Sequence, residues 1–247
     1  MKLLLVDAGN TRVKWAIAEH DAPLGHWLLH GAVAHPDLDA LAGAWRPHGI
    51  ARAIVSNVAG SGLRARLEAL LPPGRVEWFA SSAQRAGVAN GYRNPAQLGC
   101  DRFSAAIGAH ALAPGQAVVV ATCGTATTVD AVGSDGAFIG GMILPGLALM
   151  ASSLARNTAQ LPQAAPGAAL PPLFADNTND AIVSGCLSAQ AGAIERAVAA
   201  HRAGACILSG GAAPWIASAL NIPHRLVDNM VLVGLHAAAL DANEMEA

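Results

Sequence analysis

Apolar and polar positions follow two periods along the chain, one typical of strands and one typical of helices. Strand character covers residues 2–7, 12–18, 26–31, 52–56 and 76–79, and later residues 118–121, 125–131, 137–144 and 205–209. Helical spacing covers residues 36–45, 60–71, 97–112, 178–201, 213–220 and 229–240, and another helix is predicted to start after Gly146. The Pro- and Ala-rich residues 161–174 predict a loop or lid.

The same order of elements occurs twice, with three strands followed by helices and strands in alternation. This order predicts an α/β fold of two ribonuclease H-like halves, residues 1–114 and 115–247. Such duplicated halves form the actin, sugar kinase and Hsp70 (ASKHA) superfamily, in which nucleotide lies in a central cleft. Because that superfamily includes filaments, chaperones and kinases, the fold alone leaves the function open.

Composition narrows the class of protein. The chain has 247 residues, of which 53% are hydrophobic, enough for a full core. Its formal net charge is −2 and it lacks a basic run, so we expect no nucleic-acid partner. No apolar stretch reaches the roughly 18 residues of a membrane span, and the first residues lack the features of a signal peptide. We therefore expect a cytoplasmic protein without membrane association.

Neither the cysteines nor the histidines show metal-binding spacing. His26 and His30 are four residues apart, but they lie in a stretch with strand rather than helix character. No Cys-x-x-Cys pair occurs, so we expect reduced thiols and no disulfide or zinc site. The four cysteines are Cys100, Cys123, Cys186 and Cys206.

Two strand ends lead into turns of the kind that binds phosphate. Glycine lets backbone N–H groups approach an anion, and Asn or Thr side chains donate further hydrogen bonds. Asp7, on the first turn, adds a carboxylate able to hold a hydrated magnesium ion. A single turn of this kind is most often only a turn, but two of them suggest two halves that close on one nucleotide. The candidate phosphate-binding residues are Gly9, Asn10, Thr11, Gly124 and Thr125.

Between these turns lies a distinctive segment. It reads Gly91-Tyr92-Arg93-Asn94-Pro95 and then Gly99-Cys100-Asp101-Arg102, where an Ala-rich helix begins. Further segments follow the same order as in one known family: residues 7–11, 124–130, 140–146, 177–182 and 209–211. Over its full length the sequence closely resembles the type III pantothenate kinases, the family that includes proteins once named Bvg accessory factors.

The resemblance implies an enzyme that transfers phosphate from ATP to pantothenate, giving 4'-phosphopantothenate at the start of coenzyme A synthesis. Asp101 would be the general base toward the substrate hydroxyl, and Arg102 would pair with the carboxylate of pantothenate. Tyr92 and Gly99 would line the same pocket. Gly210 and Gly211 would leave backbone room for the adenine and ribose, and Asp7 would be the carboxylate on the magnesium side.

Each assignment has a simpler structural alternative. Asp7 could be a turn residue that ends a strand, and Asp101 could cap the following helix. Arg102 could be a solvated residue of the first helical turn, and Tyr92 an ordinary packing aromatic. Thr127 and Thr128 carry about even odds of simple sheet packing.

The resemblance also implies a homodimer. In the family, the threonine that matches Thr178 reaches the pantothenate site of the neighbouring subunit, which requires active sites near a two-fold interface. Thr178 follows Asp176-Asn177 at the start of a predicted helix, so it could instead be a helix cap.

One position departs from the family pattern. The family has an aspartate two residues before the glycine of the second turn, where this chain has Thr122. That aspartate is associated with potassium or ammonium, so the monovalent cation site is in doubt here. Asp130 could partly compensate for the missing carboxylate.

Two classes of function remain open. The first is the kinase, and the second is a catalytically weak relative that acts as a regulatory or accessory binding protein. The presence of Asp7, Asp101 and Arg102 favours catalysis. A phosphatase or an acetate-type kinase on the same scaffold lacks support from residues 92–102.

Overall fold

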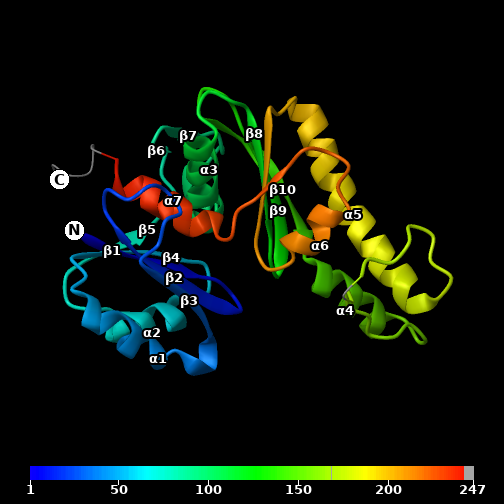
Figure 1. The fold of residues 1–247 in the computed structure, drawn as a ribbon, viewed down its shortest axis with the longest axis horizontal. Coiled ribbons are helices and arrows are strands. Elements are labelled where there is room, and N and C mark those ends of the chain that lie inside the picture. Colours follow the sequence, from blue (N-terminus) through cyan, green and yellow to red (C-terminus); the bar gives the residue numbers. More distant parts are fainter. Residues whose placement is uncertain (168, 242–247) are drawn as a thin grey trace. The chain divides into compact units, whose positions relative to one another are not determined.

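The computed structural model describes residues 1–167 and 169–241, which form two compact units. Unit 1 comprises Met1–Pro114, Gly136–Phe138 and the described C-terminal residues 230–241. Unit 2 comprises Gly115–Asp135 and Ile139–Asn229. Figure 1 labels most helices and strands of both units.

Unit 1 is built on a five-stranded sheet with the order β3-β2-β1-β4-β5. The first three strands are antiparallel, whereas β4 and β5 continue the sheet in parallel with β1. The central strand β1 is buried from its second residue to its last because both faces of the sheet are covered, which explains its continuous apolar run. The strands are β1 (Lys2–Ala8), β2 (Arg12–Glu19), β3 (Leu29–Ala34), β4 (Arg52–Asn57) and β5 (Arg75–Phe79).

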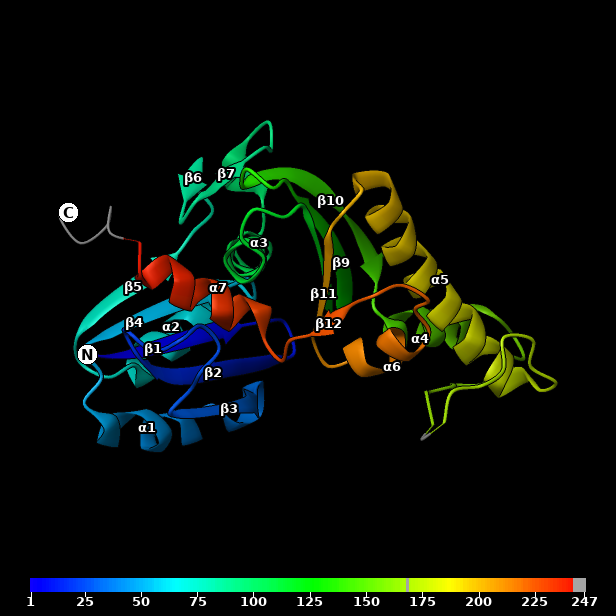
Figure 2. The same ribbon diagram turned by 45° about the horizontal axis from the view of Figure 1, so that its top comes forward.

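Helices cover both faces of this sheet (Figure 2). On one face, α1 (Ala40–Trp45) and α2 (Ser61–Leu70) pack Trp45 and Leu67 onto Leu4 and Val6. On the other, α3 (Cys100–Leu112) and α7 (Met230–Ala239) lie side by side. Their crossing is very close, since a Cβ at Gly234 would lie 1.7 Å from the Ser104 carbonyl oxygen. Only glycine permits this approach, which fixes α3 in the unit.

Short elements complete unit 1. Two of them form an antiparallel hairpin, and the first residues of β10, Ala137 and Phe138, pair in parallel with its second strand. These elements are η1 (His35–Asp37), η2 (Arg46–His48), β6 (Gln84–Arg85), β7 (Val88–Asn90) and η3 (Pro95–Gln97).

In unit 2 the strand order is β12-β11-β8-β9-β10. Strands β8 and β9 are antiparallel, whereas β11 runs parallel to both β8 and β12. The helices of the unit bury an apolar cluster that includes Val119, Leu187 and Ile216. The elements are β8 (Val118–Cys123), β9 (Ala126–Val132), β10 (Ala137–Pro145), α4 (Leu147–Asn157), α5 (Thr178–His201), β11 (Ala205–Ser209), α6 (Ala213–Ser218) and β12 (Arg225–Leu226).

The structure differs from the sequence prediction in several short elements. Strands β6, β7 and β12 were not predicted, because two or three residues are too few for a periodic pattern. The single helix predicted over residues 97–112 is instead η3 and α3, separated by extended backbone at Leu98 and Gly99. The compact units and the predicted halves are also different sets of residues, since α7 packs on α3 in unit 1.

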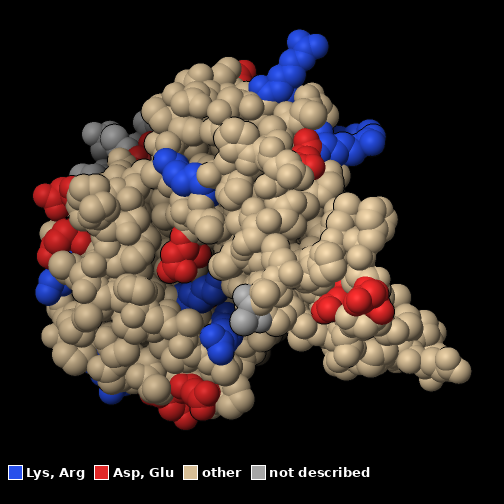
Figure 3. Space-filling model, turned by 45° about the vertical axis from the view of Figure 1, so that its right-hand side comes forward, with Lys and Arg blue, Asp and Glu red and all other residues tan. Residues whose placement is uncertain are grey.

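Within the described residues, no helix combines the length and the apolar character needed to cross a lipid bilayer. On the face drawn in Figure 3, basic and acidic side chains stand in small separate groups among uncharged residues. That face therefore carries no broad area of a single charge.

Candidate functional site

The first predicted phosphate turn lies at the carboxyl end of β1. Asp7 is 8% exposed and pairs in register with Ser56 of the parallel strand β4. The turn is closed by the Gly9 N–H, which donates to the Arg12 carbonyl at 3.1 Å. The His35 ring nitrogen Nε2 donates to the Gly9 carbonyl at 2.9 Å and fixes the turn from outside. Asn10 and Thr11 are exposed beside this buried carboxylate.

A contact between β4 and α3 brings the Asp101 carboxylate to the sheet edge that carries Asp7. The Ser56 hydroxyl lies 3.3 Å from the Cys100 sulfur, and the Cys100 thiol donates to the Asn57 carbonyl at 3.6 Å. Both groups stand where β4 ends, so the N-terminus of α3 lies beside the carboxyl ends of β1 and β4. Asp101, in the first turn of α3, therefore lies at the edge that carries Asp7.

The carboxyl group of Asp101 is held against the start of its helix. It accepts a hydrogen bond from the Arg102 N–H at 2.8 Å. Burial raises the pKa of Asp101, although this hydrogen bond and the charge of Arg102 act in the opposite direction. A Cβ at Gly99 would lie 2.6 Å from the Asp101 Oδ1 atom, so glycine leaves that oxygen its place. Gly99 occupies the N-cap position, and Asp101 satisfies one N–H of the first turn while remaining a stronger base than usual.

Arg102 and Tyr92 form one polar and aromatic unit. The Arg102 guanidinium donates to the Tyr92 hydroxyl at 2.7 Å and lies 5.7 Å from the centre of the Tyr92 ring. Tyr92 also packs on Phe138, with the ring centres 5.8 Å apart. Arg102 is only 7% exposed, so the alternative of a solvated first-turn arginine is wrong. Tyr92 has packing contacts, as the alternative for it supposed, but its hydroxyl also has a polar partner.

In unit 2 the glycine segments meet at the carboxyl ends of β8 and β11. The Gly146 N–H donates to the Thr125 carbonyl at 2.9 Å, and a Cβ at Gly146 would lie 2.1 Å from the Gly124 carbonyl oxygen. Gly210 has a φ of +97°, and its Cβ would lie 2.4 Å from the Cys123 carbonyl oxygen. The structure therefore brings Gly124 and Thr125 together with Gly210 and the adjoining Gly211. Thr127 is a buried residue of β9, in keeping with sheet packing.

Thr122 lies near the same edge, opposite Thr128 of β9 and Ser209 of β11. Asp130 pairs with Val120, which places it on the same face of the sheet as Thr122, two positions farther along β9. Asp130 is 1% exposed. Across the residues described, no group of three or more His, Cys, Asp and Glu side chains is placed to hold a metal ion.

Thr178 is the first residue of α5 and is exposed. The cap of this helix is Asn177, whose side chain accepts from the Asp180 N–H at 3.0 Å and donates to the Asp180 carboxylate at 2.7 Å. Thr178 is therefore not the cap that the alternative interpretation made it. Two exposed apolar residues, Leu173 and Phe174, precede Thr178 by five and four positions in the sequence.

Comparison with known proteins decides the family. A profile described as type III pantothenate kinase matches residues 3–200. The chain is 58% identical to the type III pantothenate kinase of Janthinobacterium sp. (strain Marseille), over 96% of this chain and 97% of the relative. The chain belongs to the type III pantothenate kinase family.

Solved structures agree on the fold of this family member. A Baf family protein from Campylobacter jejuni has a TM-score of 0.60 at 18% identity, with 94% of each chain covered. The activator of the 2-hydroxyisocaproyl-CoA dehydratase from Clostridium difficile, solved with bound ADPNP, has a TM-score of 0.55 at 14% identity. It covers 97% of this chain and 93% of that one. The predicted α/β fold class is confirmed, because these solved structures share the fold of the chain.

Several residues that support the candidate site escaped sequence reasoning. His35, Ser56 and Phe138 contact residues that lie 26, 44 and 46 positions away in the sequence. Their local sequence gives no signal of these contacts. Cys100 was expected to be a reduced thiol and was given no role in the Gly99-Cys100-Asp101-Arg102 segment. Its position between the family glycine and aspartate was the available signal, since a small side chain there faces the end of β4.

Proposed function

We propose that this chain phosphorylates pantothenate with ATP as the donor and so performs the first step of coenzyme A synthesis. The observation that carries the proposal is the grouping of Asp101, Arg102 and Tyr92 at the start of α3, on the sheet edge that holds Asp7, in a member of this kinase family. The chain is a kinase, a phosphotransferase with an alcohol group as acceptor. We place it in the cytoplasm, the compartment that supplies ATP.

Asp101 serves as the general base. In the reaction, the pantothenate hydroxyl oxygen forms a bond to the γ-phosphorus of ATP, and the bond from that phosphorus to the bridging oxygen of ADP breaks. Asp101 receives the hydroxyl proton, and its raised pKa makes it a better acceptor at neutral pH. Its hydrogen bond to the Arg102 N–H holds the carboxylate in position for this role.

Arg102 and Tyr92 bind the other end of the same substrate. The guanidinium group suits a carboxylate because its N–H groups form a planar fork, and its burial strengthens the pairing. Tyr92 offers its ring to the pantoyl part of pantothenate. Gly99 adds no side chain between this pocket and Asp101.

We assign nucleotide-binding residues in each unit. In unit 1 these are Asp7, Gly9, Asn10 and Thr11, and in unit 2 they are Gly124, Thr125, Gly210 and Gly211. The glycines in each unit leave backbone N–H groups accessible to phosphate and ribose oxygens. Asp7 would hold Mg²⁺, because a carboxylate at a strand end is a hard oxygen ligand for that ion. When bound, Mg²⁺ neutralises phosphate charge.

The monovalent cation is a separate part of the proposal. Potassium or ammonium would sit near Thr122 and use oxygens from the second turn. Thr122 supplies a hydroxyl in place of a carboxylate, while Asp130 lies on the same face of the sheet. We therefore expect a weaker cation requirement than an aspartate at position 122 would give.

The dimer is supported by apolar side chains on the surface of unit 2. On β10, Ile139 and Ile143 are 60% and 65% exposed. Because they are four residues apart in a strand, their side chains lie on the same face. Leu149 of α4 and Phe174 before α5 are also exposed, at 44% and 91%. A second copy of the chain would bury such residues and bring Thr178 toward the neighbouring pocket.

A coupled kinase assay on purified protein tests the proposal directly. We expect pantothenate-dependent ADP release and a product heavier than pantothenate by one phosphate. Arg102→Met should raise the KM for pantothenate, whereas Arg93→Met, which alters an exposed arginine of the same loop, should leave it unchanged. Absence of the phosphorylated product would overturn the proposal and leave the regulatory alternative.

The same assay, run in potassium, ammonium and sodium salts, tests the cation. Thr122→Asp should strengthen the dependence on potassium or ammonium, because it restores a carboxylate at the second turn. An unchanged salt response would mean that Asp130 or backbone carbonyls already supply the site.

A further inference from the structure

One asparagine closes the loop that carries Tyr92. The Asn90 side-chain nitrogen donates to the Ser82 and Pro95 carbonyls, each at 3.1 Å. Its side-chain oxygen accepts from the Tyr92 N–H at 3.1 Å. Both N–H bonds of the amide and one lone-pair site are thus used within the loop. The orientation of the amide is fixed by its partners, since a flipped group would place its oxygen against two carbonyl oxygens.

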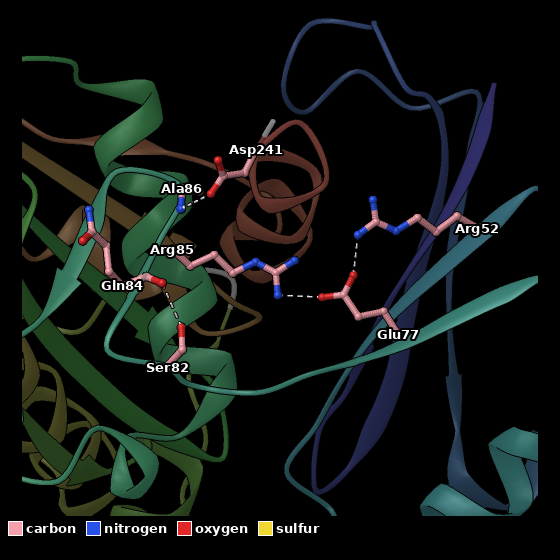
Figure 4. A network of polar contacts seen from close by, with 7 residues as sticks. All are labelled: Arg52, Glu77, Ser82, Gln84, Arg85, Ala86 and Asp241. Carbon is pink, nitrogen blue, oxygen red and sulfur yellow. Dashed lines mark hydrogen bonds and ion pairs between the residues drawn. The ribbon is translucent and has the colours of Figure 1, made fainter. Parts of the chain in front are cut away.

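The hairpin of β6 and β7, which precedes the Tyr92 loop, is anchored by separate contacts (Figure 4). The Glu77 carboxylate of β5 forms an ion pair with Arg85 of the hairpin at 2.6 Å. It forms a second ion pair with Arg52 of β4. The Ala86 N–H donates to the Asp241 carboxylate at 2.7 Å. Hydrogen bonds from Arg85 and Arg52 lower the pKa of Glu77 although burial opposes the shift. These contacts hold the hairpin tip, but none of them reaches Tyr92.

The segment after the hairpin therefore depends on Asn90 for its path. Beyond Asn90, the backbone is tied to β10 through the Gly91 N–H, which donates to the Phe138 carbonyl at 3.0 Å. Tyr92 then turns back onto Phe138 and Arg102. The Asn90 oxygen fixes the Tyr92 backbone, and its nitrogen fixes the entry and the exit of the loop.

We infer that Asn90 is a positioning residue for the acceptor substrate, acting through Tyr92 and its contact with Arg102. The inference rests on the proposed function, in which these two side chains bind pantothenate. Among the residues that the structure describes, the Asn90 side chain forms hydrogen bonds with neither Asp101 nor the phosphate turns, so its influence falls on substrate binding more than on proton transfer.

Substitution separates the donor and acceptor roles of the amide. Asn90→Asp keeps the side-chain oxygen that accepts from the Tyr92 N–H. It replaces the side-chain nitrogen, which donates to the Ser82 and Pro95 carbonyls, with an oxygen that can only accept. Asn90→Ala removes all three hydrogen bonds. We expect either change to raise the KM for pantothenate by about tenfold or more, because two or three hydrogen bonds that order the loop are lost. The KM for ATP and kcat should stay within about threefold of their original values.

A spectroscopic signal reports Tyr92 alone. Because the chain has a single tyrosine, 3-fluorotyrosine incorporated in place of tyrosine gives one ¹⁹F resonance. We expect this resonance to move toward that of free fluorotyrosine in both Asn90 variants, as the ring leaves Phe138. Ser82→Ala is the matched control, since the Ser82 hydroxyl donates only within the hairpin, to the Gln84 carbonyl at 3.1 Å. It should change neither the resonance nor the KM for pantothenate.

Coupling to Tyr92 completes the test. In a Tyr92→Ala background, Asn90→Asp should raise the KM for pantothenate no further. A further rise there, an unmoved ¹⁹F resonance, or equal increases in both KM values would each overturn the inference. If Asn90→Asp fails to fold, Asn90→Ser takes its place with the same readouts. A wild-type protein that does not phosphorylate pantothenate would refute the proposed function, and the ¹⁹F shift would still decide whether Asn90 positions Tyr92.

Discussion

The carboxyl group of Asp101 combines burial, which raises its pKa, with a fixed hydrogen bond to the Arg102 N–H. Burial makes the charged form costly, and the hydrogen bond keeps that form in one orientation. A group arranged in this way gains little for the stability of the fold. Its arrangement is the one that the proposed role of general base requires.

Replacing Asp101 with asparagine should therefore separate activity from stability. We expect Asp101→Asn to lower kcat by about 10²–10⁴-fold, the usual loss when a positioned base is removed. The unfolding temperature should stay the same or rise, because the variant no longer buries a charge. Near-normal turnover would show that Asp101 only satisfies the helix N-terminus.

The pH dependence follows from the direction of the same shift. The folded protein binds the Asp101 proton more tightly than the unfolded chain, whose carboxyl has a pKa near 3.8. Stability from this group is thus fully present below 3.8 and is lost as pH rises through the folded pKa. For kcat the sign is opposite, since the base must be charged. A pH–rate profile should therefore show kcat falling as the pH is lowered, with the midpoint of this fall above 3.8.

Asp7 should affect the nucleotide and not pantothenate. Asp7→Asn replaces a carboxylate with an amide, a poorer ligand for a hard cation, so we expect weaker binding of magnesium nucleotide. Calorimetry should show pantothenate affinity unchanged. Asp21→Asn, which alters an exposed carboxylate of the same unit, is the control. Loss of pantothenate affinity along with nucleotide affinity would contradict separate roles for Asp7 and Arg102.

Among the elements, those with local signals were predicted best. Helix α5 was predicted over residues 178–201 and spans Thr178–His201, because Asn177 and Asp180 form its cap within one turn. The Tyr92 loop could not be predicted in the same way. Its shape depends on β7 pairing with Ala137 and Phe138, almost fifty residues later, and on the Asn90 amide.

The turn after β11 offers a matched pair of glycines. At Gly210 the φ of +97° and the Cys123 carbonyl, 2.4 Å from an ideal Cβ, both exclude a side chain. At Gly211 a Cβ would meet nothing within 4 Å. Gly210→Ala should lower the free energy of unfolding by about 1–3 kcal/mol, the range for a strained backbone position. Gly211→Ala should leave it nearly unchanged in denaturant unfolding, and equal losses in the two variants would contradict this packing.

For the whole molecule, the sequence predicted the site residues that lie at strand ends. It did not predict the tertiary contacts that hold them there. The predicted residues of unit 1 meet at one sheet edge, because β1 and β4 are parallel and their carboxyl ends coincide. The contact from Ser56 to Cys100 and the contact from His35 to Gly9 complete that edge through tertiary packing alone. The place of α7 on α3 likewise depends on the facing glycines Gly108 and Gly234.

The proposed dimer makes a prediction about how two chains share a site. Each site would take Asp101 from its own chain and Thr178 from the neighbour. In a heterodimer of Asp101→Asn and Thr178→Ala chains, one site loses both groups and the other keeps both. Co-expression of the two inactive variants, or mixing after mild dissociation, should therefore restore activity, because part of the population carries one intact site.

The matched control uses the residue after Thr178. Asn179 is exposed and does not cap α5, so Asn179→Ala should remain active without a partner. Heterodimers isolated with two different affinity tags should approach half the wild-type turnover per dimer, since one of two sites works. No recovery in such verified heterodimers would place Thr178 in the site of its own chain. Recovery before any subunit exchange would instead show that Thr178→Ala was never deficient.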